Sequence, residues 1–212
     1  MRKLALALAT LLLAAPALAE EPPAVTPPPP AETPAPPAPT PPTPAGPRVV
    51  IQTTMGDITL ELDPVHAPVT VKNFLRYMKE THFDGTVIYR VEPNFVIQMG
   101  SWDANVKGRP VHEPIPLEAN NGLSNVRGAV AMARGDPNSA TADFFISLQD
   151  NPVLDHQPTD TANTTGFAVF AHVVAGMDVV DKIAAVPLGG KGPMPGAAPL
   201  DPITILKVAP AP

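Results

Sequence analysis

A single arginine, Arg90, stands inside a run of residues typical of a β-strand, in the segment YRVEPNFVIQMG that spans Tyr89–Gly100. A half-buried arginine needs a charged or hydrogen-bonding partner, or a functional role, because desolvating an unpaired charge costs several kcal/mol. Strand alternation predicts that Ile88 and Arg90 point to one face, and that Val96 and Gln98 share a face of the strand after the Glu-Pro-Asn turn. A hairpin of this kind would set a guanidinium beside a side-chain amide, over an apolar floor.

Such a pair supplies hydrogen-bond donors and a fixed charge rather than a nucleophile or a metal ligand. The residues alone also permit a plainer interpretation, in which Arg90 forms a salt bridge with Glu92 or Asp84 at the end of a strand. Both interpretations remain open at this point.

Other kinds of chemistry find little support in the sequence. The chain has no cysteine, which excludes disulfides, thiolate zinc sites and cysteine nucleophiles. Its five histidines show no HxxxH or HxH spacing, so no metal site is expected. No G-x-S-x-G nucleophile elbow occurs, and the Gly-Gly-Lys-Gly run at 189–192 lacks the Ser or Thr and the strand-to-helix setting of a phosphate loop. We expect that run to be a surface loop. A net charge of -6 argues against a nucleic-acid partner.

The elements that must position Arg90 are mostly short strands. Thr59 and Glu61 alternate with Ile58 and Leu60, which is the period of a half-buried strand. The strand candidates are Arg48–Thr54, Asp57–Asp63, Val87–Val91, Phe95–Met99, Ala129–Ala133, Phe144–Leu148, Phe167–Ala171 and Ile203–Val208.

Two helices complete the pattern. One opens at Ala67–Val69, with proline in its first turn, and places four apolar residues at helical spacing: Val71, Phe74, Leu75 and Met78. The other spans Met177–Ala184. Short, turn-separated strands that do not alternate regularly with helices predict a mainly β fold, a closed eight-stranded antiparallel barrel capped by two α-helices.

The start of the chain has the layout of a secretory signal peptide, residues 1–19. A basic MRK is followed by an apolar stretch and by a small-residue cleavage site at Ala17–Ala19. The apolar stretch is interrupted by Pro16 and is too short for a membrane span, so we expect export and no stable span after cleavage. An uncleaved anchor is the alternative. The expected location is the periplasm, with full secretion as the other possibility.

Residues 20–47 are rich in proline, alanine and threonine, and many of the chain's 31 prolines lie there. Proline fixes φ and lacks a donor, so this segment is expected to be a disordered or polyproline-like linker. The alternative is a ligand for a proline-recognition domain, for example through Pro34–Pro37. The folded domain is expected over residues 48–209, with a short tail at 210–212.

Three ordered motifs then resemble one family. YRVEPNFVIQMG resembles the F-H-R-x-x-x-x-F-x-x-Q-G signature of the cyclophilins, the peptidyl-prolyl cis-trans isomerases. The segments RGAVAMARGDPNSATADFFIS (Arg127–Ser147) and VLDHQ…GFAVFAHVVAGMDVVDKI (Val153–Ile183) match two further family motifs, and Ala67–Leu75 resembles the family's first helix. The similarity runs in order from about Arg48 to Val208.

The resemblance implies an isomerase of eight-stranded barrel fold that needs no cofactor or metal and acts as a monomer on proline-containing segments of unfolded or exported proteins. It implies that Arg90 is the catalytic residue. The residues implied to line the proline pocket are Phe95, Val96, Phe145, Leu154 and Phe167. Those implied to contact the substrate backbone are Gln98, Ala133 and Arg134. The alternative function is a proline-segment-binding or chaperone module with little catalysis.

Four positions depart from the best-known family pattern. Val153 replaces a tryptophan linked to cyclosporin binding, which predicts weak binding of that drug. Phe167 replaces histidine or tyrosine, and Val96 replaces a methionine but keeps an apolar wall. Asp143 replaces a glutamine, and it adds a charge near the groove whose effect on the rate the sequence leaves open.

Overall fold

The structure is a computed structural model that describes residues 46–194 and 196–212. The expected signal peptide and nearly all of the expected linker lie outside the described residues. At the junction, the carbonyl of Pro47 accepts a hydrogen bond from the Leu62 N–H at 2.9 Å. At the other end, the Ala211 N–H donates to the Arg48 carbonyl at 2.9 Å, so the expected tail continues a strand pair.

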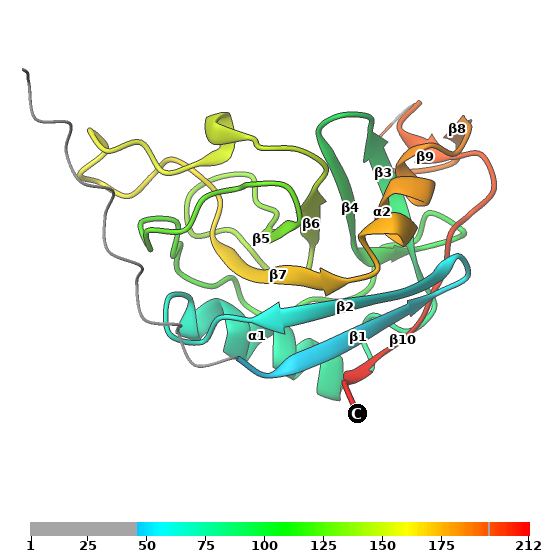
Figure 1. The fold of residues 1–212 in the computed structure, drawn as a ribbon, viewed down its shortest axis with the longest axis horizontal. Helices are drawn as coiled ribbons and strands as arrows, with labels where there is room; N and C mark the ends of the chain where they lie inside the picture. Colours follow the sequence, from blue (N-terminus) through cyan, green and yellow to red (C-terminus); the bar gives the residue numbers. More distant parts are fainter. Residues whose placement is uncertain (1–45, 195) are drawn as a thin grey trace, which may run out of the picture. The chain divides into compact units, whose positions relative to one another are not determined.

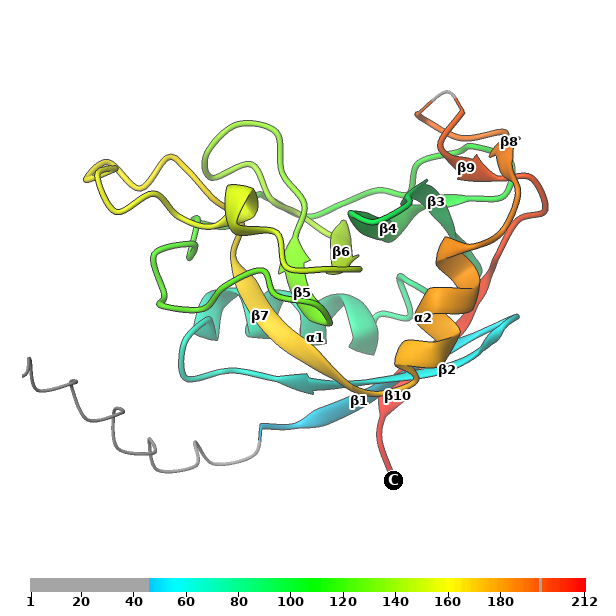
Figure 2. The same ribbon diagram turned by 45° about the horizontal axis from the view of Figure 1, so that its top comes forward.

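Eight antiparallel strands form one sheet in the order β10-β1-β2-β7-β5-β6-β4-β3. Their bounds are β1 (Arg48–Thr53), β2 (Gly56–Leu62), β3 (Thr86–Glu92), β4 (Val96–Asp103), β5 (Ala129–Met132), β6 (Phe144–Ser147), β7 (Val169–Ala175) and β10 (Ile205–Pro210). The end strands meet through a bridge between Val87 and Thr204, which nearly closes the sheet into a barrel. Figures 1 and 2 show this curvature together with helices α1 (Pro68–Lys79) and α2 (Met177–Ala184). The predicted fold class is confirmed.

Local sequence explains these elements. In β2, Ile58, Leu60 and Leu62 are buried, as the alternation predicts. Helix α1 begins at Pro68, where the missing N–H leaves no hydrogen bond unmade, and its apolar stripe faces the core. Helix α2 has the predicted bounds and follows Gly176, whose φ of 88° suits glycine.

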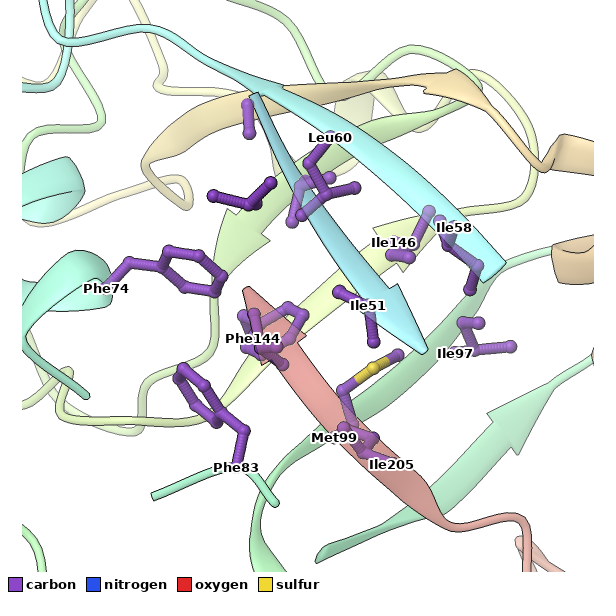
Figure 3. Close-up of a cluster of buried hydrophobic side chains, with 14 of the residues drawn as sticks. Ile51, Ile58, Leu60, Phe74, Phe83, Ile97, Met99, Phe144, Ile146 and Ile205 are labelled. Carbon is purple, nitrogen blue, oxygen red and sulfur yellow. The ribbon is translucent and has the colours of Figure 1, made fainter. Parts of the chain in front are cut away.

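The barrel interior is a single apolar cluster to which strands and both helices contribute. Figure 3 shows part of it, with Ile51, Ile58, Leu60, Phe74, Phe83, Ile97, Met99, Phe144, Ile146 and Ile205 labelled. Phe74 of α1 packs on Phe83 and Phe144 at ring-centroid distances of 5.2 and 5.4 Å. A filled interior means that any ligand must bind on an outer face.

One prediction about the arginine strand is wrong. Ile88 pairs with Met99 and Arg90 pairs with Gln98, so one extra residue, Tyr89, stands between the two pairs. This bulge reverses the alternation. Ile88 therefore points into the barrel, whereas Arg90 lies on the outer face with Gln98.

The strand patterns also miss some short elements. Strands β8 (Leu188–Gly190) and β9 (Ala198–Pro199) pair with each other, so the Gly-Gly-Lys-Gly run expected to be a surface loop begins inside a hairpin. This hairpin lies beside β3 in both views, and the Val91 N–H donates to the Ala197 carbonyl at 2.7 Å. A 3-10 helix, η1, spans Pro152–Leu154.

Candidate active site

An open cavity of about 320 Å³ lies on the outer face of the barrel. It brings together all nine residues that the sequence assigned to a site: Arg90, Phe95, Val96, Gln98, Ala133, Arg134, Phe145, Leu154 and Phe167. They come from β3, β4 and the turn between them, from β6, from η1, and from the segments that follow β5 and precede β7. Residues far apart in sequence thus line the same cavity.

The apolar part of the cavity belongs to a second cluster, distinct from the barrel interior. Its buried members are Val96, Ala129, Ala131, Phe145 and Val169, with Phe95, Leu123, Ala133, Leu154 and Phe167 packed against them. The rings of Phe145 and Phe167 meet edge to face at 5.4 Å. These side chains form a small apolar wall of a kind that suits a compact ring.

The polar part of the cavity is built around Arg90, whose side chain is 24% exposed. Its Nη1 donates to the side-chain oxygen of Gln98 at 3.0 Å. Its Nε donates to Glu92 at 3.4 Å. The amide neighbour and the salt bridge, which the sequence left as alternatives, therefore coexist. The bulge in β3 is what turns this guanidinium outward.

Gln98 is buried, at 8% exposure, and both ends of its side-chain amide are hydrogen-bonded. Its Nε2 donates to the Tyr89 hydroxyl at 2.6 Å, while its oxygen accepts from Arg90. Gln98 is therefore held on two sides, and it in turn holds Arg90.

Asp143 also lines the cavity, as the sequence anticipated for a charge near the groove. Burial raises the pKa of the Asp143 carboxyl, and hydrogen bonds from Ser101 and Tyr89 act in the opposite direction. The Ser101 N–H donates to its Oδ1 at 2.8 Å. Burial, together with the nearby Asp143 charge, raises the pKa of the Tyr89 hydroxyl, which keeps that hydroxyl protonated.

The Arg134 side chain holds the loop that precedes Phe167 in the apolar wall. Its Nε and Nη2 donate to the Gly166 carbonyl at 2.9 and 2.7 Å, and Nη2 also donates to the Thr164 carbonyl at 2.9 Å. The guanidinium carbon lies 5.0 Å from the centre of the Phe167 ring. Most donors of this side chain are thus used to hold Phe167 in place.

Sequence reasoning missed four residues that also line the cavity: Gly135, Ser139, Thr141 and Met194. Three of them lie in the loop between β5 and β6. Met194 lies between β8 and β9, so it reaches the cavity only because that hairpin packs beside β3. No local pattern in the sequence signals such a contact.

Within residues 46–194 and 196–212, no group of three or more His, Asp or Glu residues is placed to hold a metal ion. None of the helices in the same residues has both the length and the apolar character needed to cross a membrane.

Comparison with known proteins agrees with this geometry. The family described as cyclophilin-type peptidyl-prolyl cis-trans isomerase/CLD matches residues 48–209. A peptidyl-prolyl cis-trans isomerase of Acinetobacter baylyi is 45% identical over 165 residues, which cover 77% of this chain and 85% of that protein. Peptidyl-prolyl cis-trans isomerase B of Escherichia coli is 46% identical over 145 residues, covering 68% and 88%.

The fold has solved counterparts as well. A cyclophilin-type isomerase of Cryptosporidium parvum, solved in the presence of the dipeptide Ala-Pro, has a TM-score of 0.64 at 22% identity and covers 78% of this chain and 99% of that chain. The likeness at this identity concerns the fold. The family match and the two bacterial relatives go further, and they show that the chain belongs to the cyclophilin-type peptidyl-prolyl cis-trans isomerases.

Proposed function

We propose that this isomerase binds proline-containing segments of exported proteins in the outer cavity and that Arg90 is its catalytic residue. The observation that carries the proposal is the position of the Arg90 guanidinium, which is fixed by Gln98 and faces the same cavity as the apolar wall of Phe95, Val96 and Phe145.

The reaction sets clear demands on such a site. An Xaa–Pro bond isomerises over tens of seconds because amide resonance imposes a barrier of roughly 18–20 kcal/mol. When the amide twists, the proline nitrogen regains its lone pair and becomes a hydrogen-bond acceptor. An arginine N–H directed at that nitrogen stabilises the twisted state more than the planar one, which is the condition for catalysis.

The remaining residues hold the substrate in place for this step. The apolar wall binds the proline ring and excludes water, which strengthens a hydrogen bond inside the cavity. Gln98 is placed to fix Arg90 and to hold a neighbouring carbonyl. Most N–H groups of the Arg134 side chain donate to carbonyls of the loop before Phe167. The proposed contact of Arg134 with the substrate backbone is therefore made mainly by its main-chain atoms.

Export is the second part of the proposal. It is supported by the layout of residues 1–19 as a secretory signal peptide. The proposed location is the periplasm, with secretion as the alternative, and the proposed state is a monomer.

Two measurements test the proposal separately. The purified protein should accelerate the slow, proline-limited refolding phase of a model exported protein, and Arg90→Ala should lose that effect. Unchanged refolding by a protein that still isomerises short peptides would contradict the folding role. Separately, fractionation of cells that express the full chain should place the shortened protein outside the cytoplasm, and an unshortened cytoplasmic protein would contradict export.

A further inference from the structure

The residues that lead into β6 divide between the two faces of the sheet. Three of them belong to the barrel interior: Ala140, Ala142 and Phe144. The residues that alternate with these three line the outer cavity: Ser139, Thr141, Asp143 and Phe145. Along the outer face, the lining therefore changes from an aromatic ring to a carboxylate and then to two hydroxyls. The cavity has an anionic, polar side next to its apolar wall.

The Asp143 carboxylate lies over strand β4, close to the apolar wall. Gln98 of β4 pairs with Phe145 of the wall, and Gly100 follows two residues further along the same strand. A Cβ added at Gly100 would lie 2.8 Å from Asp143 Oδ1, so the missing side chain at Gly100 leaves room for the carboxylate. The Ser101 N–H donates to the same oxygen at 2.8 Å. Two residues span roughly 7 Å of strand, which is within reach of a long side chain next to a proline bound on the wall.

The carboxylate has no cationic partner in the part of the chain that the structure describes, since none of the salt bridges there involves Asp143. Both arginines that line the cavity have other partners. Arg90 donates to Gln98 and Glu92, and Arg134 donates to the carbonyls of residues 164 and 166. Burial raises the pKa of the Asp143 carboxyl. A cation brought by the substrate would supply the charge that the ionised form lacks.

We propose that Asp143 is a specificity-determining residue of this isomerase, and that its carboxylate selects substrates with a lysine or arginine close to the proline. In a half-buried site, attraction between opposite charges and repulsion between like charges are both stronger than in water. An acidic residue at the same place in the substrate is therefore disfavoured. The Thr141 hydroxyl, on the same face, offers a further acceptor to the N–H groups of a basic side chain. This inference rests on the proposed function, because it requires the proline to bind in this cavity.

A set of short Ala-Pro peptides tests the selection. In each peptide, one residue within two positions of the proline is lysine, glutamine or glutamate, and isomerisation is measured by NMR exchange. For at least one position, the wild-type protein should give a kcat/KM about tenfold higher with lysine than with glutamate, and glutamine should fall between them. The ratio of the lysine to the glutamate value is compared within each variant, so a general change in activity cancels.

Asp143→Asn removes the charge with little change of shape and should bring that ratio close to one. Asp143→Gln is a second uncharged variant, with the residue that the best-known family pattern has at this position, and it should do the same. Either folded variant suffices. The matched control is Asp136→Asn, which removes one negative charge from the same loop at an exposed residue outside the cavity lining. It should keep the wild-type ratio.

Loss of the ratio in the Asp143 variants and its retention in Asp136→Asn would support the selection. A wild-type ratio near one at every position, or a high ratio retained without the Asp143 charge, would overturn it. Equal loss in Asp136→Asn would also overturn it, because the net negative charge of the chain would then be the cause. Arg90→Ala keeps the two proposals apart. If that variant isomerises the glutamine peptide as fast as the wild type, the proposed function fails, whereas an Arg90-dependent enzyme without charge preference contradicts only this inference.

Discussion

Phe144 and Phe145 are neighbours in β6, yet their rings belong to two separate apolar clusters on opposite faces of the sheet. Phe144 lies in the barrel interior and contacts Phe74 and Phe83. Phe145 lies in the outer wall and contacts Phe167. Strand alternation thus places a residue of the barrel interior and a residue of the proposed binding wall side by side in sequence.

The same substitution at these two positions should therefore separate stability from binding. Phe144→Leu should lower the free energy of unfolding by about 1–2 kcal/mol and leave KM for a proline peptide unchanged in the folded protein. Phe145→Leu should raise KM severalfold with a smaller loss of stability. Urea unfolding and peptide kinetics on both variants check this. Equal effects on KM would contradict the division of the two faces.

The bracing of Phe167 by Arg134 makes a second prediction. Arg134→Ala removes the hydrogen bonds to the Gly166 and Thr164 carbonyls and the guanidinium over the ring, so the loop before β7 should loosen. We expect weaker peptide binding, by about fivefold to tenfold, because Phe167 is no longer held in the wall. NMR titration with a proline peptide measures it. Arg134→Lys keeps the charge but not the fork of donors, so a binding constant equal to wild type in that variant would refute the bracing role.

Close packing at Gly100 predicts a position that tolerates no side chain. Its φ is 143°, and an added Cβ would lie 2.7 Å from the Ala142 carbonyl oxygen. Gly100→Ala should cost more than about 2 kcal/mol of stability, because backbone strain and a backbone clash add. Gly122→Ala is the control: its φ is 78°, but no atom of the described part of the chain lies within 4 Å of the added Cβ. Thermal unfolding that shows equal losses for both would mean that strain alone acts at Gly100.

The half-buried position of His82 predicts that the stability of the fold depends on pH. Burial, and then the Arg109 charge, lower its pKa below the ordinary 6.5, and its buried Nε2 has no hydrogen-bond partner among the residues that the structure describes. The unfolded state binds this proton more readily than the folded state, so stability should fall as the pH drops below about 6.5. His172 shifts in the same direction, again mainly through burial. His82→Phe should therefore reduce the slope of stability against pH between 5 and 7 without abolishing it. An unchanged slope would show that His82 does not titrate differently on folding.

Much of the fold and of the candidate site could be predicted from the sequence because the signals were local. The alternation in β2, the proline at the start of α1 and the spacing of Val71 and Phe74 each specify an element without reference to residues distant in sequence. The site residues could be named because ordered motifs resemble a known family, and all nine line one cavity.

The features that could not be predicted depend on contacts between residues that are far apart in sequence. The bulge at Tyr89 is defined only by the register of β3 against β4, and a shift of one residue reverses which side chains face the core. The contact of Met194 with the cavity requires the β8–β9 hairpin to pack beside β3. The engagement of the Arg134 side chain with residues 164–166 requires a loop 30 positions away in sequence.

The central claim is that Arg90 stabilises the twisted amide, and the exchange rate of a short Xaa–Pro peptide measured by NMR tests it most directly. The wild-type domain should accelerate exchange, whereas Arg90→Ala should lower kcat by about a hundredfold or more while peptide binding persists, because the donor acts in the transition state. Arg90→Lys should recover little of the rate, since a lysine cannot both hold Gln98 and present a second rigid N–H. Acceleration by Arg90→Ala equal to that of the wild type would contradict the account.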